Sequence, residues 1–350
     1  MKAEKGSGLR VIVCSGGSGG HMFPARALFA AMQEKGYDVS MAIDARGDAF
    51  CEDIIAKIVF KTVKFSAKEF PIGIYRSFII FFKFLNFWLK KRPNLVIGFG
   101  GVFTIIPVIL SKILGSRIVI YEQNAVLGKA NEFLMKFADL RLASFLLGEG
   151  WTEVPAPVRS SFVGKRTPYE CDGIIKILII GGSQGAASFS HIIPKALGML
   201  APEERHSLEI VQQVAYGSIE KLKTIYEHLG VKSTLKGFIH QVAEEMFRSQ
   251  LVICRAGAST LSELAAAGRP AVLIPYPGAM DNHQLHNAMH YKDKGAAWVL
   301  EEENDIERKL WRLLRKILQD RELLKTASFH MMNSSVGHAT DRFIELIERV

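Results

Sequence analysis

The chain has 350 residues, of which 49% are hydrophobic and 23% charged, and its formal net charge is +9. This length suits two domains better than one, and the composition is that of an ordinary globular protein. The four cysteines show no paired spacing and no apolar signal region precedes Val11, so we expect a reducing cytoplasm, buried inert thiols and no signal peptide.

The first predicted element is a buried parallel strand, residues 10–14, which runs into a glycine-rich loop, residues 15–20, and then a helix-forming stretch, residues 23–35. A strand that feeds a helix through glycines exposes backbone N–H groups, which favours an anion. The loop is not a dinucleotide fingerprint, because Met22 stands where glycine is required. His21 follows the loop at the carboxyl edge of the strand, where open α/β sheets bind ligands. It can act as a general base, although a lone histidine is more often structural.

Basic and aromatic residues gather between residues 57 and 92, where nine lysines and arginines accompany a single acid, Glu69. Residues 78–89 inside this segment are rich in phenylalanine, but they are too few, and too interrupted by Lys83, to span a bilayer. An apolar helix with a basic collar indicates binding to an anionic membrane surface. The alternative is a core helix with solvated ends. No nucleic-acid-binding signature accompanies the positive charge, so we expect no nucleic acid partner.

Strand and helix signals alternate through the chain, which predicts right-handed βαβ units and parallel sheets. The second half repeats the first, because the apolar run 175–180 leads into a second glycine loop that starts 165 residues after the first (181 minus 16). A proline-bearing stretch, residues 154–168, is the candidate linker. Strands are expected at 11–14, 38–43, 57–63, 95–98, 117–121, 140–143, 175–180, 208–214, 234–238, 251–254, 271–275 and 297–300.

The predicted fold class is therefore α/β, with two Rossmann-like parallel-sheet domains that face each other across a cleft. We expect an acceptor- and membrane-facing domain at residues 1–158 and a nucleotide-binding domain at residues 159–334. The last helix, at about residues 335–350, is a candidate to pack back on the first domain.

Polar residues that could bind a ligand are more closely spaced in the second half of the chain than in the first. A strand at residues 251–254 is followed by a small-residue loop, in which Ser259 and Thr260 with the loop N–H groups can hold a diphosphate. Glu263 lies one turn into the following helix, where a carboxylate suits a ribose diol. Its alternative role is that of a first-turn acid that interacts favourably with the helix dipole.

A polar stretch at residues 275–288 supplies amide and carboxylate groups of the kind that sugar hydroxyls need. Asp281 within it can also cap a helix. The three nearby histidines share no zinc pattern, and the chain contains no Asp-x-Asp pair, so we expect neither a metal nor another cofactor. The three are His283, His286 and His290.

Seven motifs, in order along nearly the whole chain, resemble those of the MurG family of UDP-N-acetylglucosamine:undecaprenyl-diphospho-muramoylpentapeptide N-acetylglucosaminyltransferases. The motifs are residues 16–21, 98–101, 122–124, 157–159, 181–186 and 255–263, and Gln284 with Asn287 and Ala288. The sequence departs from the family pattern at Val102, where a tyrosine is usual, at Ala156, where an asparagine is usual, and at Asn282-His283. The first two departures concern the acceptor side.

The resemblance implies a GT-B fold and inverting transfer of N-acetylglucosamine from UDP-N-acetylglucosamine to the 4-hydroxyl of the muramoyl sugar of the undecaprenyl-linked acceptor. This step converts lipid I to lipid II in peptidoglycan synthesis, and so serves cell wall biogenesis, cell shape and cell division. The implied location is peripheral, on the cytoplasmic face of the inner membrane. His21 is the implied base; the implied donor-binding residues are Ser18, Gly19, Gly20, Asn124, Arg159, Ser183, Ile239, Ala258, Ser259, Thr260, Glu263 and Gln284.

Two other readings stay open on the sequence. One is another GT-B enzyme, such as a lipid glycosyltransferase or a UDP-sugar epimerase. The other is a non-catalytic membrane-surface scaffold that senses a UDP-sugar.

Overall fold

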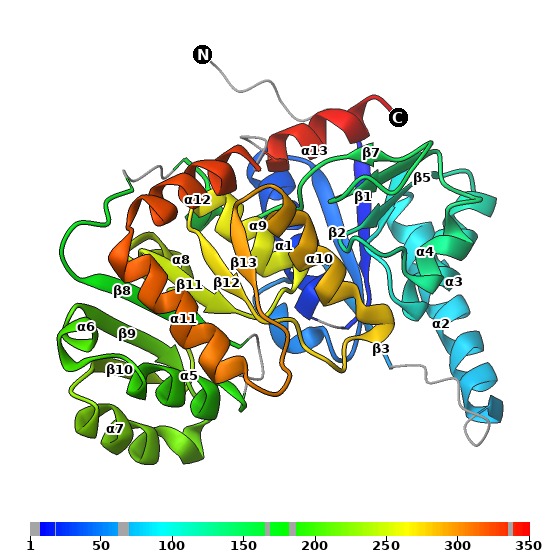
Figure 1. Ribbon diagram of the computed structural model, residues 1–350. Helices are drawn as coiled ribbons and strands as arrows, with labels where there is room; N and C mark the ends of the chain where they lie inside the picture. Colours follow the sequence, from blue (N-terminus) through cyan, green and yellow to red (C-terminus); the bar gives the residue numbers. More distant parts are fainter. Residues whose placement is uncertain (1–7, 18, 62–69, 165–168, 182–186, 335–338) are drawn as a thin grey trace. The chain divides into compact units, whose positions relative to one another are not determined.

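A computed structural model describes residues 8–17, 19–61, 70–164, 169–181, 187–334 and 339–350. The chain divides into two compact units, Met1–Ser160 together with His338–Val350, and Ser161–Gly337. Each unit is built on one sheet in which every described strand pair is parallel (Figure 1). The prediction of two Rossmann-like parallel-sheet domains is confirmed.

The sheet of the first unit has seven strands in the order β3-β2-β1-β4-β5-β6-β7. β1 begins one residue outside the core and is buried along the rest of its length, as expected of a parallel strand covered on both faces. The strands are β1 (Arg10–Ser15), β2 (Asp38–Asp44), β3 (Lys57–Phe60), β4 (Leu95–Gly98), β5 (Arg117–Glu122), β6 (Leu140–Ala143) and β7 (Thr152–Glu153).

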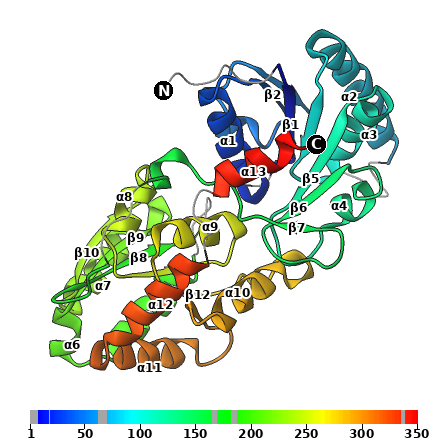
Figure 2. The same cartoon turned by 90° about the horizontal axis from the view of Figure 1, so that it is seen from above.

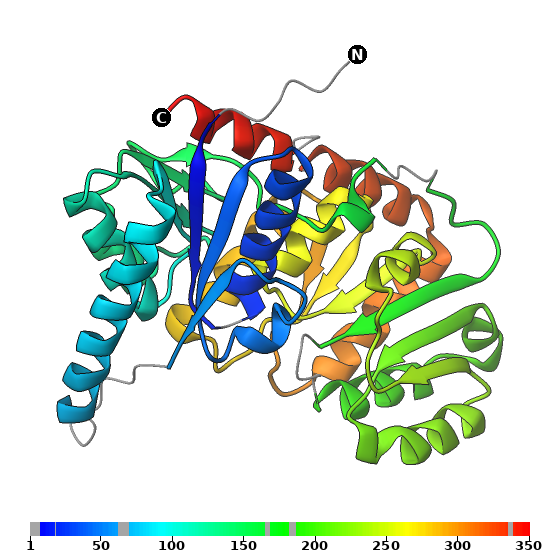
Figure 3. The same cartoon turned by 180° about the vertical axis from the view of Figure 1, so that it is seen from behind.

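Two apolar layers cover the two faces of this sheet. α1 (Gly19–Glu34) and α13 (Ala339–Glu348) contribute to one layer, and α2 (Phe70–Lys91), α3 (Ile105–Ile113) and α4 (Lys129–Leu134) contribute to the other. Figure 3 shows α1 lying along β1 and β2. Each helix thus buries one apolar face against alternate side chains of the strands.

The last helix, α13, belongs to the first unit although it is last in sequence (Figure 2). Its Phe343, Ile344 and Ile347 are buried among side chains of β1 and α1. The Phe343 ring stacks on Phe99 with centroids 6.0 Å apart and meets Tyr121 edge-on at 5.1 Å. This cluster ties the end of the chain to the central strands of the first sheet.

The second unit has a six-stranded sheet in the order β10-β9-β8-β11-β12-β13. The central strand β8 pairs with both β9 and β11, so the strand order reverses there, at the kind of position where α/β sheets bind ligands. The strands are β8 (Ile175–Ile180), β9 (Leu208–Gln213), β10 (Lys232–Lys236), β11 (Leu251–Cys254), β12 (Ala271–Leu273) and β13 (Ala297–Val299). The helices are α5 (Phe189–Gly198), α6 (Pro202–His206), α7 (Ile219–His228), α8 (Val242–Phe247), α9 (Ala258–Ala267), α10 (His283–Asp293), α11 (Ile306–Gln319) and α12 (Glu322–Asn333).

Four helices differ from the sequence-based expectation. α1 begins at Gly19 rather than at residue 23, so His21 lies in its first turn. The aromatic helix α2 has 22 residues and extends from Phe70 to Lys91. α11 and α12 occupy a stretch to which the sequence assigned no element. None of the helices in the described residues is both long enough and apolar enough to cross a membrane.

Candidate functional site

The first glycine loop of the N-terminal unit is held against a second loop that follows the neighbouring strand β4. The backbone N–H of Gly16 donates to the carbonyl of Gly100 at 3.1 Å. Gly100 and Gly101 both have φ of +87°, and a Cβ on Gly101 would lie 3.0 Å from the Cα of Gly16. Glycine at these positions therefore lets two loops at the carboxyl edge of the sheet come into backbone contact.

The side chain of His21 lies against groups that follow β4 and β5. Its Nδ1 lies 3.3 Å from Nε2 of Gln123, which follows β5. A Cβ on Gly100 would lie 3.1 Å from Nε2 of His21, so the ring rests directly against the backbone after β4. The half-buried ring thus occupies the position at the carboxyl edge that the sequence predicts for a general base.

Gln123 has a role that the sequence analysis did not assign to it. Its side chain is buried, and among the described residues its Oε1 has no hydrogen-bond partner. Which atom of the amide faces Nδ1 decides the tautomer of the histidine, because an oxygen there accepts from Nδ1–H and leaves the basic lone pair on Nε2. The two ends of an amide are assigned from such contacts.

Glu122 organises the loop that carries Asn124. One of its carboxylate oxygens accepts from the Asn124 backbone at 3.0 Å, and the other accepts from the Gly128 N–H at 3.1 Å and the Asn131 amide at 2.9 Å. Burial raises the pKa of this carboxyl group, and the hydrogen bonds oppose that rise. Glu122 is therefore a structural acceptor that presents Asn124. In the sequence, the feature that could have indicated this role is a glutamate at the end of an apolar strand.

The remaining N-terminal candidates have simpler surroundings. Gly19 and Gly20 form the first turn of α1. The guanidinium of Arg159 lies 6.0 Å from the ring centroid of Phe23 on the same helix, within cation–π range. Ser18 lies outside the described residues. Of the two departures on this side, Val102 is half exposed, whereas Ala156 is buried in the core with β1 and α13.

In the C-terminal unit, the proposed diphosphate loop leads into α9. The N-cap residue of the helix is Gly257, which has no side chain to cap the first N–H groups. Ala258, Ser259 and Thr260 form the first turn, and the buried Glu263 follows in the second. A helix N-terminus with two hydroxyl groups is suited to a phosphate.

Arg255 lies immediately before this helix, and its guanidinium bonds to other groups of the protein. Its guanidinium pairs with Glu302 at 2.5 Å and donates to the carbonyls of Ile274 and Pro275 at 3.2 and 3.1 Å. It also lies 4.8 Å from the ring centroid of Phe189. Arg255 thus joins the ends of β11 and β12 to α5, and it shapes the loop rather than supplying a charge for a ligand.

The polar stretch is anchored to the same region. Oε1 of Gln284 accepts from the Tyr276 backbone at 3.0 Å, and Nδ2 of Asn287 donates to the Ala256 carbonyl at 3.2 Å. Asp281 does not cap α10; the cap position is Asn282, and both residues have positive φ. Gln284 therefore lies in the first turn of α10, tied to the loop after β12.

Ile239 is buried in the segment between β10 and α8, and Ser183 lies outside the described residues. In the described part of the chain, no group of three or more histidine, cysteine, aspartate or glutamate side chains has an arrangement that could hold a metal ion. The four cysteines are all buried and reduced, and burial raises the pKa of Cys51 to about 11.

Comparisons with known proteins identify the two units. Residues 11–141 match the glycosyltransferase family 28 N-terminal domain, and residues 176–344 match the glycosyltransferase family 28 C-terminal domain. A crystal structure of MurG from Acinetobacter baumannii superposes with a TM-score of 0.82 at 26% identity, covering 98% of this chain and all of that one. A putative UDP-N-acetylglucosamine 2-epimerase from Listeria monocytogenes shares only the fold, with a TM-score of 0.67 at 12% identity over 98% of this chain and 96% of that one.

Two curated relatives are similar over nearly the full length of both chains. One from Zymomonas mobilis subsp. mobilis is 33% identical over 97% of this chain and 92% of its own, and one from Bartonella henselae is 34% identical over 97% and 93%. Both are UDP-N-acetylglucosamine–N-acetylmuramyl-(pentapeptide) pyrophosphoryl-undecaprenol N-acetylglucosamine transferases. With both halves matched in order, the chain belongs to glycosyltransferase family 28 and, within it, to the MurG family of N-acetylglucosaminyltransferases.

Proposed function

We propose that this chain transfers N-acetylglucosamine from UDP-N-acetylglucosamine to the 4-hydroxyl of the muramoyl sugar of an undecaprenyl-diphosphate-linked muramoylpentapeptide. The observation that carries the proposal is the identity of 33–34% to such transferases over 97% of the chain. The epimerase alternative has only a shared fold in its favour.

The C-terminal unit supplies the donor site. The N–H groups and hydroxyls at the start of α9 (Ala258, Ser259, Thr260) hold the diphosphate, and Glu263 accepts from the ribose hydroxyls. Gln284 contacts the N-acetylglucosamine. The uracil lies against Ile239, and the nucleotide also meets Ser18, Gly19, Gly20, Arg159 and Ser183.

The chemical step is a single displacement at the sugar carbon C1, which inverts its configuration. The C1–O bond to UDP breaks as the acceptor oxygen bonds to C1, and the hydroxyl proton passes to Nε2 of His21. This requires the lone pair on Nε2, and hence the orientation of Gln123 in which its oxygen accepts from Nδ1–H. The 3.3 Å contact between the amide and Nδ1 is compatible with either orientation of the amide, and the proposed chemistry requires the one that turns the oxygen towards Nδ1.

Charge develops on the departing diphosphate as the bond to C1 breaks. Backbone N–H groups and the dipole of α9 oppose that charge without reorganisation during the reaction. The proposed chemistry therefore uses no metal-bound diphosphate.

The acceptor is a lipid, and α2 offers a surface for a peripheral location on the cytoplasmic face of the inner membrane. One stripe of the helix is exposed, with Tyr75, Phe78 and Phe82 at 66%, 60% and 62% exposure, while Ile80 and Phe84 on the opposite side are buried in the core. The buried side chains make α2 part of the core, and the exposed stripe supports the proposed contact with a membrane surface. Lys90 and Arg92 at its end are exposed and suit anionic headgroups.

The decisive test is incubation of the protein with radiolabelled UDP-N-acetylglucosamine and lipid I, followed by extraction into organic solvent. Label in the organic phase and stoichiometric release of UDP support the proposal. Release of UDP with label only in water, or conversion of the free sugar nucleotide to its 2-epimer, would contradict it.

A further inference from the structure

The turn that follows β2 lies beside the first glycine loop, at the edge of the sheet that carries the proposed base. β1 and β2 are parallel neighbours in which Ser15 lies opposite Ile43, so the residues that follow the two strands meet at the carboxyl edge. A Cβ on Gly17 would overlap Oδ1 of Asp44 and the Cβ of Arg46. Asp44 and Arg46 are therefore in direct contact with the glycine loop.

Asp44 holds the side chain of Arg46 in one place. Asp44 is the last residue of β2, and its side chain is only 1% exposed. Oδ1 accepts from the backbone N–H of Arg46 at 3.0 Å, while Oδ2 accepts from Nη2 at 2.6 Å and from Nε at 3.2 Å. A buried carboxylate is costly without a cation, so this pairing fixes the guanidinium beside the glycine loop.

The outer edge of the same guanidinium is available to a ligand. The Arg46 side chain is 60% exposed, and in the part of the chain that the structure describes it bonds only to Asp44. The next acidic residue along the chain, Asp48, is paired instead with Lys57 at 2.6 Å. Charged hydrogen-bond donors that are already held in place lose little conformational freedom on binding. Arg46 is thus preorganised to receive an anionic group.

The guanidinium of Arg46 is suited to phosphate or carboxylate oxygens, which its planar fork of N–H donors matches. The acceptor of the proposed reaction carries both kinds of oxygen, in its diphosphate and at the carboxyl groups of its peptide. Arg46 belongs to the N-terminal unit and lies at the same sheet edge as His21, whereas the groups proposed for the donor lie mainly in the C-terminal unit. Its partner is therefore expected on the acceptor rather than on the sugar nucleotide.

We propose that Arg46 binds an anionic oxygen group of the lipid-linked acceptor, and that Asp44 is the positioning residue that holds it there. This inference rests on the proposed function and adds to it a pair of residues outside the seven motifs that mark the family. The diphosphate and a peptide carboxylate present the same oxygens to the guanidinium. Because Asp44 offsets the charge of Arg46, the contact depends on directed hydrogen bonds more than on net charge.

The test measures initial rates of UDP release by the full-length protein with a soluble short-chain analogue of the acceptor. We expect Arg46→Gln to raise the KM for this acceptor by about tenfold or more, and to leave the KM for UDP-N-acetylglucosamine within about twofold. Arg46→Lys keeps the charge but not the planar fork, and should restore only part of the loss. Asp44→Asn keeps the guanidinium but loosens it, so we expect a smaller rise in the acceptor KM.

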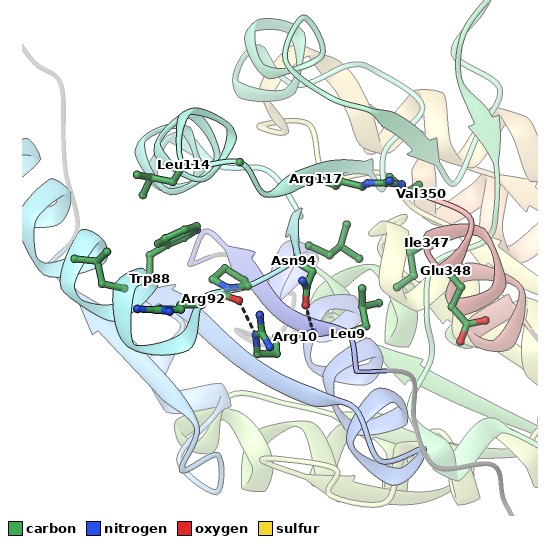
Figure 4. A pocket seen from close by; sticks show the side chains of 14 residues that line it. Leu9, Arg10, Trp88, Arg92, Asn94, Leu114, Arg117, Ile347, Glu348 and Val350 are labelled. Atoms are coloured by element: carbon green, nitrogen blue, oxygen red, sulfur yellow. Dashed lines mark hydrogen bonds between the residues drawn. The ribbon is translucent and has the colours of Figure 1, made fainter.

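Two further variants separate binding from folding. Arg46→Gln leaves Asp44 buried without its cation, whereas Asp44→Asn/Arg46→Gln removes both charges and should show the same rise in the acceptor KM. The matched control is Arg117→Gln. Arg117 is an exposed arginine that begins β5 and lines a pocket at the opposite, amino-terminal edge of the same sheet (Figure 4). A strand of this length separates the two edges by roughly 20 Å, so this variant should keep the acceptor KM of the parent.

A second acceptor analogue, in which a methylamide replaces the peptide, identifies the anionic group. An Arg46 effect that persists with this analogue assigns the diphosphate, and an effect that disappears assigns a peptide carboxylate. An acceptor KM that stays at the level of the parent in both Arg46→Gln and the double variant would overturn the proposal, as would an equal rise in the KM for donor and acceptor. Calorimetric titration of the acceptor analogue measures the same change in affinity without turnover, so failure of this contact is distinguishable from failure of transfer.

Discussion

The ring of His21 and the side-chain amide of Gln123 form one unit, with Nδ1 of the histidine 3.3 Å from Nε2 of the glutamine. They are 102 residues apart in sequence and meet because β1 and β5 flank β4 in the sheet. A histidine can accept a proton only through the nitrogen that has no hydrogen, so its partner on the other nitrogen controls its chemistry. Gln123 is therefore a positioning residue for the proposed base.

The first prediction concerns this pair. Gln123→Leu removes the acceptor from Nδ1–H, and we expect kcat to fall by about tenfold or more with donor affinity unchanged. Gln123→Glu keeps an acceptor and stabilises the protonated ring, so it should retain activity and move the acidic limb of the pH–rate profile to higher pH. Steady-state kinetics across pH measure both effects. An unchanged profile and kcat in both variants would show that Gln123 does not act on His21.

The base itself is tested by His21→Ala, for which we expect a loss of about 10²–10⁴-fold in kcat. UDP affinity, measured by calorimetry, should stay within about twofold of the parent, because the donor groups lie mainly in the other unit. Near-full activity of this variant would assign the base to another residue. Activity that disappears in excess chelator would instead contradict the metal-free account of the leaving group.

The donor site is tested at Glu263. Glu263→Ala removes the proposed acceptor for the ribose hydroxyls, and since a hydrogen bond to a charged group contributes about 1.5–3 kcal/mol, UDP affinity should fall by about tenfold or more. Because Glu263 is only 7% exposed, Glu263→Gln keeps the volume and separates binding from folding. Glu227→Ala, on an exposed position of α7, is the control. Unchanged affinity in both Glu263 variants would remove this residue from the site.

Much of the fold could be predicted because its signals are local. The apolar runs before Gly16 and Gly181 indicated buried parallel strands, and β1 and β8 are such strands. The start of α1 was wrong by four residues, because the glycines at 19 and 20 favour loops in isolation and tertiary contacts with β1 and β2 override that preference. α11 shows a regular apolar spacing at Leu310, Leu314 and Ile317 that could have identified it.

The candidate site was less accessible to sequence reasoning, because its contacts are long-range. The role of Gln123 depends on the rotamer that brings it to His21, and that of Arg255 on carbonyls twenty residues away. Arg255 looked like part of a phosphate loop, yet its guanidinium is occupied by Glu302 and the carbonyl after β12. Whether a charged side chain of a motif bonds within the protein or can bind a ligand therefore depends on the fold.

The packing of α13 gives a prediction about stability. Phe343 is fully buried against Phe99 and Tyr121, so Phe343→Ala should lower the free energy of unfolding of the first unit by about 3–5 kcal/mol. Phe329→Ala in α12, where the ring is 59% exposed, should change it by less than about 0.5 kcal/mol. Denaturant titration measures both. Equal stability of the two variants would show that α13 is not part of the core of the first unit.

The exposed stripe of α2 gives the last prediction. The helix also carries residues that hold the core, since Trp88 donates to Ser116 and Lys83 to the Val59 carbonyl at 2.8 Å, so Trp88 is a poor choice for testing membrane contact. Phe78→Ser/Phe82→Ser changes only the stripe, and we expect it to release the protein from anionic vesicles in a sedimentation assay. Turnover of a soluble short-chain acceptor should stay within about twofold, because the stripe does not include the carboxyl edge of the sheet. Phe329→Ser, which changes an equally exposed ring in the other unit, should leave vesicle binding intact.

Because the apolar face and Lys90 and Arg92 contribute together, vesicle binding of the parent protein should also weaken as the salt concentration rises. Vesicle binding by the double variant at the level of the parent would assign the membrane contact to another surface.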